Sequence, residues 1–313
     1  MGREKLLNLL KVCISLALLI LLVRQIGWQQ TLETLRGAKL AHLTAAFVLY
    51  VLGIVVRAYR WQILLDALSI DLPLARLVNL YFVGTFFSNF LPTGIGGDVV
   101  RVYELSRQSK RPIESVGTVL LDRATGLLVL FLIALMALPF SYPLIAPNIT
   151  AAILILCLGS WAGLALALRR NWLERWGLLR IMDKIKQLRE LYESVHACGP
   201  KAIGGALAIS LVFNVLLIAV NYLIALSLGV EIPVWYFLLF IPLISFLLVL
   251  PISLSGLGVR EGGYVYLFAQ AGISAPLALS MSLLFYALNV ATGLIGGVLY
   301  ALEGARGYVE DRE

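Results

Sequence analysis

The chain reads Leu91-Pro-Thr-Gly-Ile-Gly-Gly-Asp-Val-Val-Arg101 at one point and Ser255-Gly-Leu-Gly-Val-Arg-Glu-Gly-Gly263 at another. Both stretches place glycines and charged side chains within otherwise apolar regions. Backbone amides without partners in hydrocarbon cost several kcal/mol each, so irregular backbone at that depth must be buried by protein or lined by water. Each stretch therefore predicts a re-entrant hairpin rather than a straight helix that faces lipid.

The remainder of the sequence is that of a polytopic membrane protein. Hydrophobic residues make up 60% of the 313 residues and charged residues only 14%, which excludes a soluble domain. A bilayer core of ~30 Å needs about 20 apolar residues per helix. Such segments run over 6–26, 42–65, 74–98, 113–140, 149–168, 202–229, 234–258, 262–272 and 277–302. We expect an all-α integral membrane protein with about six spanning helices and two re-entrant helical hairpins, or about eight membrane segments in one domain, 1–313.

The distribution of basic residues predicts the orientation. The net charge of +7 comes from short basic segments beside apolar runs, as the positive-inside bias requires, so we do not expect nucleic-acid binding. Residues 1–11 and 101–111 are then cytoplasmic. Segment 169–201 carries eight Lys and Arg residues at helical spacing with apolar ones, which predicts a cytoplasmic amphipathic connector.

An internal repeat is visible around the two glycine-rich stretches. Pro92 and Arg101 lie nine residues apart, as do Pro251 and Arg260, with a period of 159 residues. The stretch 124–128 also recurs at 291–295. Each half, 1–140 and 149–302, has an odd number of crossings, which predicts an inverted repeat whose hairpins meet near the midplane.

Two adjacent charges lie deep within an apolar segment. Counted from Pro112, Arg123 is roughly 16 Å into a helix that rises 1.5 Å per residue. An ionised side chain at such depth marks a functional site or a buried structural pair. Because adjacent residues do not face each other on a helix, Asp122 and Arg123 each need a partner, and Asp98, Glu261, Arg101 and Arg260 are available.

The glycine-rich stretches also resemble an anion site in outline. Glycines let backbone amides converge on an anion at a helix start, and an arginine follows each stretch, although glycine also serves a hairpin that merely turns tightly. Arg57 and Arg60 lie at a helix end. The first interpretation is that their side chains snorkel toward the membrane surface, and the second is that they bind a lipid headgroup. The expected substrate-binding residues are Asn89, Thr93, Gly96, Gly97, Asp98, Arg101, Asp122, Arg123, Ser255, Gly258, Arg260 and Glu261.

No cofactor, metal or disulfide is expected. The three cysteines, Cys13, Cys157 and Cys198, share no metal-binding spacing. The two histidines, His42 and His196, lie near interfaces, and no nucleophile elbow or zinc-protease motif occurs. We therefore expect that the protein is not an enzyme.

The stretches Asn89 to Arg101, Leu120-Leu-Asp-Arg123 and Ser255 to Gly262 resemble the lysylphosphatidylglycerol synthase transmembrane-region family. In that family the module is the flippase part of the multiple peptide resistance factor and also occurs alone. The resemblance implies inverted hairpins and lipid translocation in the cell membrane of a prokaryote. This sequence lacks the soluble aminoacyl-transferring domain, so lysyl transfer is not expected.

The expected function is thus a flippase or scramblase that moves a phospholipid or lipid-linked headgroup between leaflets. A small-solute or ion transporter on the same inverted plan is the alternative, and an intramembrane lipid-modifying enzyme is a third reading. The expected partner is a membrane phospholipid or lipid-linked substrate. The sequence is also compatible with a homo-oligomer.

Overall fold

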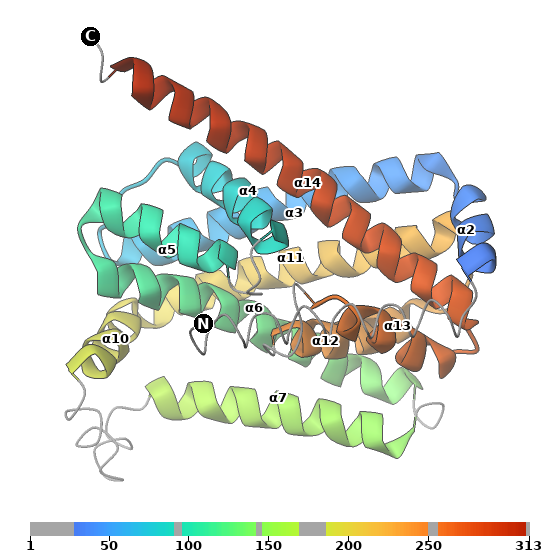
Figure 1. Ribbon diagram of the computed structural model, residues 1–313. Helices are drawn as coiled ribbons and strands as arrows, with labels where there is room; N and C mark the ends of the chain where they lie inside the picture. The colour runs from blue at the N-terminus through green and yellow to red at the C-terminus, as the bar shows by residue number, and fades with distance from the viewer. Residues whose placement is uncertain (1–27, 91–95, 142–145, 169–185, 250–255, 311–313) are drawn as a thin grey trace, which may run out of the picture. The chain divides into compact units, whose positions relative to one another are not determined.

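The computed structural model describes residues 28–90, 96–141, 146–168, 186–249 and 256–310, with side chains described as far as residue 303 (Figure 1). Within these ranges every element is an α-helix and none is a strand. The helices are α2 (Trp28–Arg36), α3 (Leu40–Ala67), α4 (Leu74–Phe90), α5 (Gly96–Ser109), α6 (Pro112–Ser141), α7 (Pro147–Leu168), α10 (Lys186–Ala197), α11 (Gly199–Ser227), α12 (Val234–Val249), α13 (Val259–Ala269) and α14 (Ala275–Glu310).

Five of the described helices are long and apolar enough to cross a membrane: α3, α6, α7, α11 and α14. The all-α membrane class expected from the sequence is therefore confirmed. The first expected spanning segment, 6–26, lies outside the described residues. The short polar helix α2 was not expected, because it lacks the apolar run by which the other helices were found.

Each of the two expected hairpins contains a short described helix on either side of its undescribed residues. Helix α4 has 17 residues and α12 has 16, or about 25 Å at 1.5 Å per residue, which falls short of a ~30 Å core. Helices α5 and α13 are shorter still. Residues 91–95 and 250–255 lie outside the described residues, so the re-entrant path stays a prediction.

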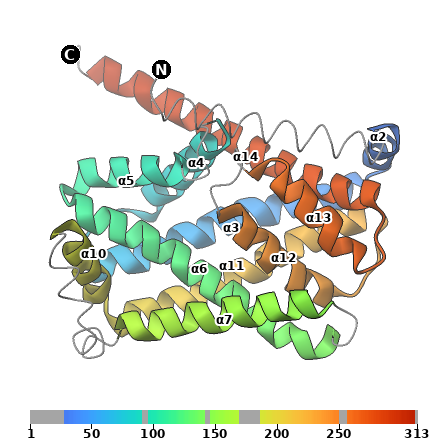
Figure 2. The same ribbon diagram turned by 60° about the horizontal axis from the view of Figure 1, so that its bottom comes forward.

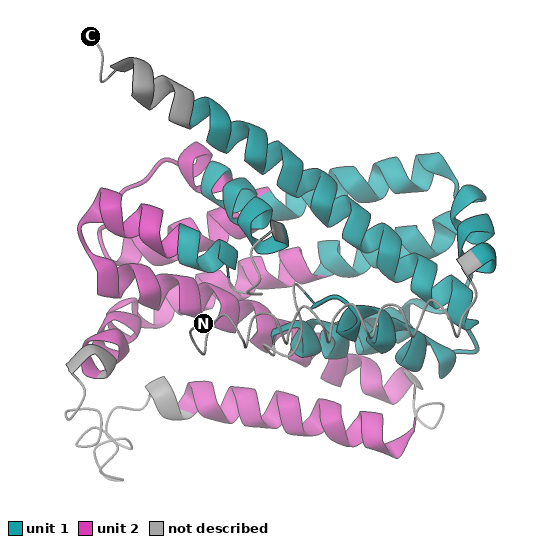
Figure 3. Ribbon diagram, viewed as in Figure 1, with its two compact units in different colours: residues 1–54, 79–100, 215–313 teal, residues 55–78, 101–214 magenta. Residues whose placement is uncertain are grey.

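The chain forms two compact units, which are described separately (Figure 3). Unit 1 comprises residues 1–54, 79–100 and 215–313, and unit 2 comprises 55–78 and 101–214. Four helices, α3, α4, α5 and α11, begin in one unit and end in the other. Each unit therefore contains residues from both halves of the expected sequence repeat.

In unit 1, α13 packs against both α12 and α14, and α12 and α13 lie side by side in both views (Figures 1 and 2). Aromatic rings fill the space between them. Phe268 of α13 lies 5.2 Å from Phe237 and 5.3 Å from Phe240 of α12, and it stacks on Tyr264. Rings at these separations add an electrostatic preference to their burial, which fixes α13 on α12.

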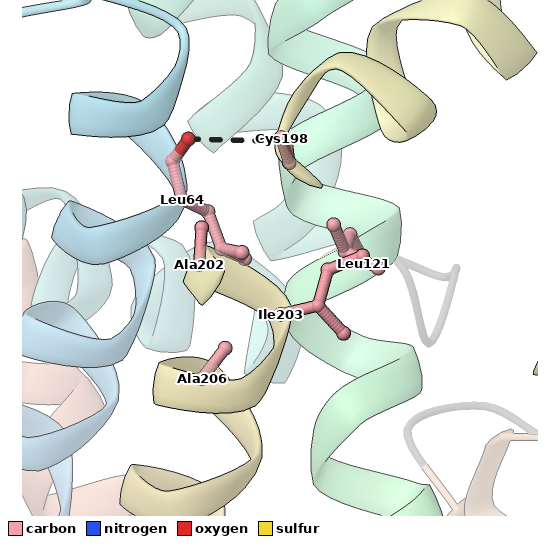
Figure 4. Close-up of a cluster of buried hydrophobic side chains, with 6 residues drawn as sticks. All are labelled: Leu64, Leu121, Cys198, Ala202, Ile203 and Ala206. Carbon is pink, nitrogen blue, oxygen red and sulfur yellow. Dashed lines mark hydrogen bonds between the residues drawn. The ribbon is translucent and has the colours of Figure 1, made fainter. Parts of the chain in front are cut away.

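In unit 2, α6 packs against α7 and α10, and a small apolar cluster joins α3, α6 and α11. Figure 4 shows the side chain of Ile203 beside Leu121 and that of Leu64 beside Ala202. Cys198 belongs to this cluster, with its Sγ 4.0 Å from the Leu64 carbonyl oxygen. Burial raises the pKa of the Cys198 thiol to about 11, so this residue is a packing residue rather than a nucleophile.

The order of helix types recurs along the chain. Helices α2 to α6 are short, long, medium, short and long, and α10 to α14 follow the same order. The end of α3 and the end of α11 also share one cap: Ser69 and Gly229, 160 residues apart, both have positive φ, at 54° and 73°. The next amide donates to a carbonyl five residues back in both, Ile70 to Leu65 and Val230 to Ala225. These matches favour two structural copies, and their inversion stays a prediction.

Candidate functional site

Asp122 lies in the interior of α6. It is ten residues beyond Pro112, or about 15 Å along the helix axis, and is only 1% exposed. The residues around it are apolar enough for α6 to span a bilayer. The local sequence therefore forms a continuous helix that carries one carboxylate deep among hydrophobic side chains.

Two arginines from other helices reach this carboxylate, and all three residues belong to unit 2. Arg60 of α3 donates from Nε to Asp122 Oδ1 at 2.7 Å, and Arg101 of α5 donates from Nη2 to Oδ2 at 3.1 Å. The side chains are between 2% and 5% exposed. Both carboxylate oxygens are thus engaged by guanidinium groups, and three helices meet at one acidic residue.

The surroundings hold Arg60 in one position. Its Nη1 donates to Ser210 Oγ of α11 at 3.0 Å, and Ser210 in turn donates to the Ala206 carbonyl oxygen. A Cβ at Gly126 would lie 2.8 Å from Arg60 Nη1, so glycine leaves the room that the guanidinium occupies. Asn214 Nδ2 donates to the Gly126 carbonyl oxygen at 2.9 Å and ties α11 to α6 at the same level.

Aromatic rings lie within cation–π distance of the guanidiniums. Arg101 Cζ lies 4.1 Å from the centroid of the Trp61 ring, and Trp61 is fully buried. Arg57 and Arg60 lie 5.1 Å and 5.7 Å from the Phe213 ring. A cation–π contact leaves the N–H donors of a guanidinium available, and their planar fork suits carboxylate and phosphate oxygens.

A second charged pair lies in unit 1, at the start of α13. Arg260 donates to Glu261 Oε1 from Nε at 3.1 Å and from Nη2 at 2.6 Å, and from Nε also to Ser282 Oγ of α14 at 3.2 Å. Its Cζ lies 4.3 Å from the Tyr286 ring. Glu261 Oε2 accepts the Gly258 amide at 2.6 Å, which caps α13.

Two described glycines of the expected anion site have structural roles. Gly97 allows two helices to pack closely, and Gly258 lies at the start of a helix. A Cβ at Gly97 would lie 2.1 Å from the Gly84 carbonyl oxygen, and the Gly97 amide donates to Ser88 Oγ at 3.1 Å, so α5 begins against α4. Gly258 has φ of 80°, a conformation that glycine adopts without strain. The amides of Gly97 and Gly258 thus donate to side chains of the protein itself, Ser88 and Glu261.

The twelve residues expected at the site fall into separate groups. The structure joins Arg101 with Asp122 in unit 2 and Arg260 with Glu261 in unit 1. Asn89 of α4 donates to the Asn289 carbonyl oxygen of α14 at 3.3 Å within unit 1. Gly96 is buried, Asp98 and Arg123 are half-buried, and Thr93 and Ser255 lie outside the described residues.

Arg60 is not among the expected substrate-binding residues, because the sequence analysis ranked headgroup binding second to snorkelling for it. The snorkelling interpretation is wrong for it, because its side chain is 4% exposed and bonded to Asp122. The position of Arg60 in the sequence could have indicated its burial. Arg60 lies seven residues before the end of a 28-residue helix, or about 10 Å along the axis from that end, which is inside the helix rather than at its end.

The described residues contain no group of three or more His, Cys, Asp or Glu side chains that could hold a metal ion. The arrangement in unit 2 instead suits an oxyanion. Guanidinium forks that already bind the two oxygens of a carboxylate also fit the oxygens of a phosphate.

Comparison with known proteins finds membrane proteins that align with this chain over most of their length. A UPF0104 membrane protein of Pyrococcus horikoshii is 24% identical over 93% of this chain and 95% of its own. A UPF0104 membrane protein of Methanothermobacter thermautotrophicus is 26% identical over 88% of each chain. These relatives agree with a multi-pass membrane protein, and their names assign no activity.

A family model described as the lysylphosphatidylglycerol synthase TM region matches residues 8–297, nearly the whole chain and all three motifs that carried the resemblance. The chain therefore belongs to the lysylphosphatidylglycerol synthase transmembrane-region family.

Proposed function

We propose that the protein is a flippase or scramblase that moves a phospholipid or a lipid-linked headgroup between the leaflets of a prokaryotic cell membrane. The observation that carries the proposal is the buried contact of Arg60 and Arg101 with Asp122, which joins the short helix α5 to the candidate spanning helices α3 and α6. Ionised groups inside a membrane protein are costly, and they recur where a polar guest must cross.

The chemistry of the cluster supports a headgroup as that guest. A phospholipid crossing the bilayer has to bring its phosphate through hydrocarbon, where an unpaired charge is strongly disfavoured. The arginine forks supply the donors that a phosphate loses on leaving water, while the acyl chains need no protein contact because lipid surrounds them. Membership of a family whose resemblance implies lipid translocation agrees with this assignment.

The same contacts are less suited to catalysis. Asp122 is engaged on both oxygens by arginines, which hold it as an ion-pair partner, whereas a general base needs a free oxygen. We therefore propose transport without a chemical step.

The experiment that tests this is a leaflet-exchange assay. Purified protein is reconstituted in liposomes that contain a phospholipid labelled on its acyl chain, and a membrane-impermeant quencher reports which leaflet holds the label. We expect exchange well above that of protein-free vesicles. Arg101→Gln should slow it by about tenfold or more, the effect of losing roughly 1.4 kcal/mol at the barrier.

Arg107→Gln is the matched control, because Arg107 lies on the same helix α5 and is exposed. It should change the rate by no more than about twofold, as surface substitutions do. The proposal fails if folded protein moves no lipid from a panel of headgroups, or if Arg101→Gln and Arg107→Gln behave alike.

A further inference from the structure

Helix α14 carries a polar side chain at the centre of its candidate membrane span. Asn289 lies fourteen residues from either end of the span Ala275–Glu303, or about 21 Å from each. Its Oδ1 is buried and has no hydrogen-bond partner among the residues that the structure describes, although the side chain as a whole is only half-buried. A polar atom without a partner is costly in hydrocarbon, so this amide requires a partner that the described helices do not supply.

The face of α14 that carries Asn289 contacts other helices of unit 1. One turn of spacing separates each member of this face from the next: Ser282, Tyr286, Asn289 and Gly293. Ser282 Oγ accepts from Arg260 Nε of α13 at 3.2 Å, and a Cβ at Gly293 would lie 2.6 Å from Asn89 Nδ2 of α4. The amide therefore lies on a face that is directed toward both expected hairpins.

The opposite face of α14 is directed away from these helices. It carries Leu294 and Val298, which are 52% and 60% exposed. Asparagine side chains in spanning helices also bond across helix–helix interfaces, so a second copy of this chain is the other source of a partner. A second copy would pack on the exposed face, and Asn289 lies on the other side of the helix.

The contact between α4 and α14 at this level does not use the Asn289 side chain. Asn89 Nδ2 donates to the main-chain carbonyl oxygen of Asn289 at 3.3 Å. Any side chain at position 289 preserves that carbonyl. The amide is thus not needed to hold α4 against α14, and it remains available to a ligand.

The atoms of this face determine what kind of group can bind. The buried Oδ1 accepts hydrogen bonds, so its ligand must present an N–H or O–H donor, which a phosphodiester lacks. An ammonium would need a carboxylate, but Glu261 is engaged by Arg260 on one oxygen and by the Gly258 amide on the other. A hydroxyl donates to Oδ1, accepts from Nδ2 and brings no charge. Tyr286 adds a second neutral hydroxyl partner on the same face.

We infer that the transported lipid carries hydroxyl groups in its headgroup, as a glycerol or sugar headgroup does, and that one of them bonds the Asn289 amide at the centre of the span. This inference rests on the proposed function and adds the chemical class of the substrate. It assigns Asn289 to substrate binding, and it makes no use of the charged cluster of unit 2.

The test compares two lipids with the same labelled acyl chain, phosphatidylglycerol and phosphatidylpropanol. Both are anionic and have a three-carbon headgroup, and only the first has hydroxyls. The full-length protein in liposomes should move phosphatidylglycerol at least about fivefold faster, because the propyl group leaves the amide without its partner. Equal rates would overturn the inference while leaving the transport function standing. Absence of movement for both lipids would overturn the transport function itself.

Asn289→Leu keeps the size of the side chain and removes the amide, so it should reduce the preference to below about twofold. Asn79→Leu is the matched control. Asn79 is also a half-buried asparagine that connects α4 with α14, through Glu303, but it lies only five residues into α4. This variant should keep the wild-type ratio. A preference unchanged in Asn289→Leu, or lost equally in both variants, would show that Asn289 does not select the headgroup.

Thermal unfolding in neutral detergent separates ligand binding from a structural role. Asn289→Leu should unfold no lower than the wild type, and a marked fall would show that the amide bonds the protein itself, which would overturn the inference. Short-chain phosphatidylglycerol should raise the unfolding temperature of the wild type more than short-chain phosphatidylpropanol does, because a ligand of the folded state stabilises it. In Asn289→Leu the two lipids should act equally, and equal shifts in the wild type would count against the hydroxyl contact.

Discussion

Asp122 is the residue on which the polar interior of unit 2 depends. It bonds two arginines from two other helices, and all three side chains are almost completely buried. Removing one member of a buried ion pair leaves the remaining charge without compensation in a medium of low dielectric constant. We therefore expect substitution of Asp122 to destabilise the protein more than substitution of either arginine.

Asp122→Asn should lower the free energy of unfolding by about 3 to 5 kcal/mol, because two guanidiniums then lie close together without the carboxylate. The measurement is thermal unfolding of purified protein in detergent. Glu104→Gln, which removes the partner of Arg76 in a partly exposed pair, should cost no more than about 1 kcal/mol. Similar losses in the two variants would contradict a special role for Asp122.

Gly126→Ala tests the position of Arg60 without removing a charge. The new methyl group would lie 2.8 Å from Arg60 Nη1 and push the guanidinium from its site, so we expect lipid exchange in liposomes to fall at least about fivefold. Gly159→Ala is the matched control, since a Cβ at Gly159 meets nothing within 4 Å. Its helix should gain slightly in stability and its transport rate should not change.

At the scale of elements, the repeated helix ends at Ser69 and Gly229 show how one backbone geometry is met by two residue types. Both residues have positive φ, and both are followed by the same amide-to-carbonyl bond. A side chain in the left-handed region brings its Cβ too close to a carbonyl oxygen, whereas glycine has no such contact. The first copy therefore contains strain that the second does not.

Ser69→Gly should raise the unfolding free energy by up to about 1 kcal/mol, and Gly229→Ala should lower it by a similar amount. A Cβ at Gly229 meets nothing within 4 Å, so the second effect arises from the backbone alone. Thermal unfolding of both variants beside the wild type measures the two shifts. Changes of the same sign would indicate that the two ends are not equivalent.

Element prediction succeeded where the apolar run was long and failed where it was not. The expected segment 113–140 corresponds to α6, and 202–229 to α11, within a few residues. Segment 74–98 contains α4 and the start of α5, on either side of residues 91–95, which the structure does not describe. Of the expected connector, 169–201, the described part contains α10 and the first residues of α11.

At the scale of the whole molecule, the inverted repeat is the prediction with the widest consequence. The recurring helix order, the shared caps at Ser69 and Gly229, and the positive φ of Lys110 and Gly272 after α5 and α13 favour two copies of one unit. If the copies are inverted, equivalent turns lie on opposite sides of the membrane.

Arg107→Cys and Ser274→Cys place single thiols at exposed positions near these two turns, in a chain whose three native cysteines are replaced by alanine. A membrane-impermeant maleimide added to intact cells should label Cys at position 274 and leave position 107 unlabelled until the membrane is opened, because the basic segment 101–111 is expected inside. Labelling of both positions from the same side would show parallel rather than inverted copies.

The sequence by itself determined the membrane class, most of the helices and the candidate residues Arg101, Asp122, Arg260 and Glu261, because hydrophobicity, helical spacing and misplaced charge are local properties of the chain. Only the tertiary structure decided which charges meet. Arg60 joins Asp122 across 62 residues, whereas Arg260 bonds its own neighbour. Partner choice depends on how helices distant in sequence pack together, and no local pattern of residues contains that information.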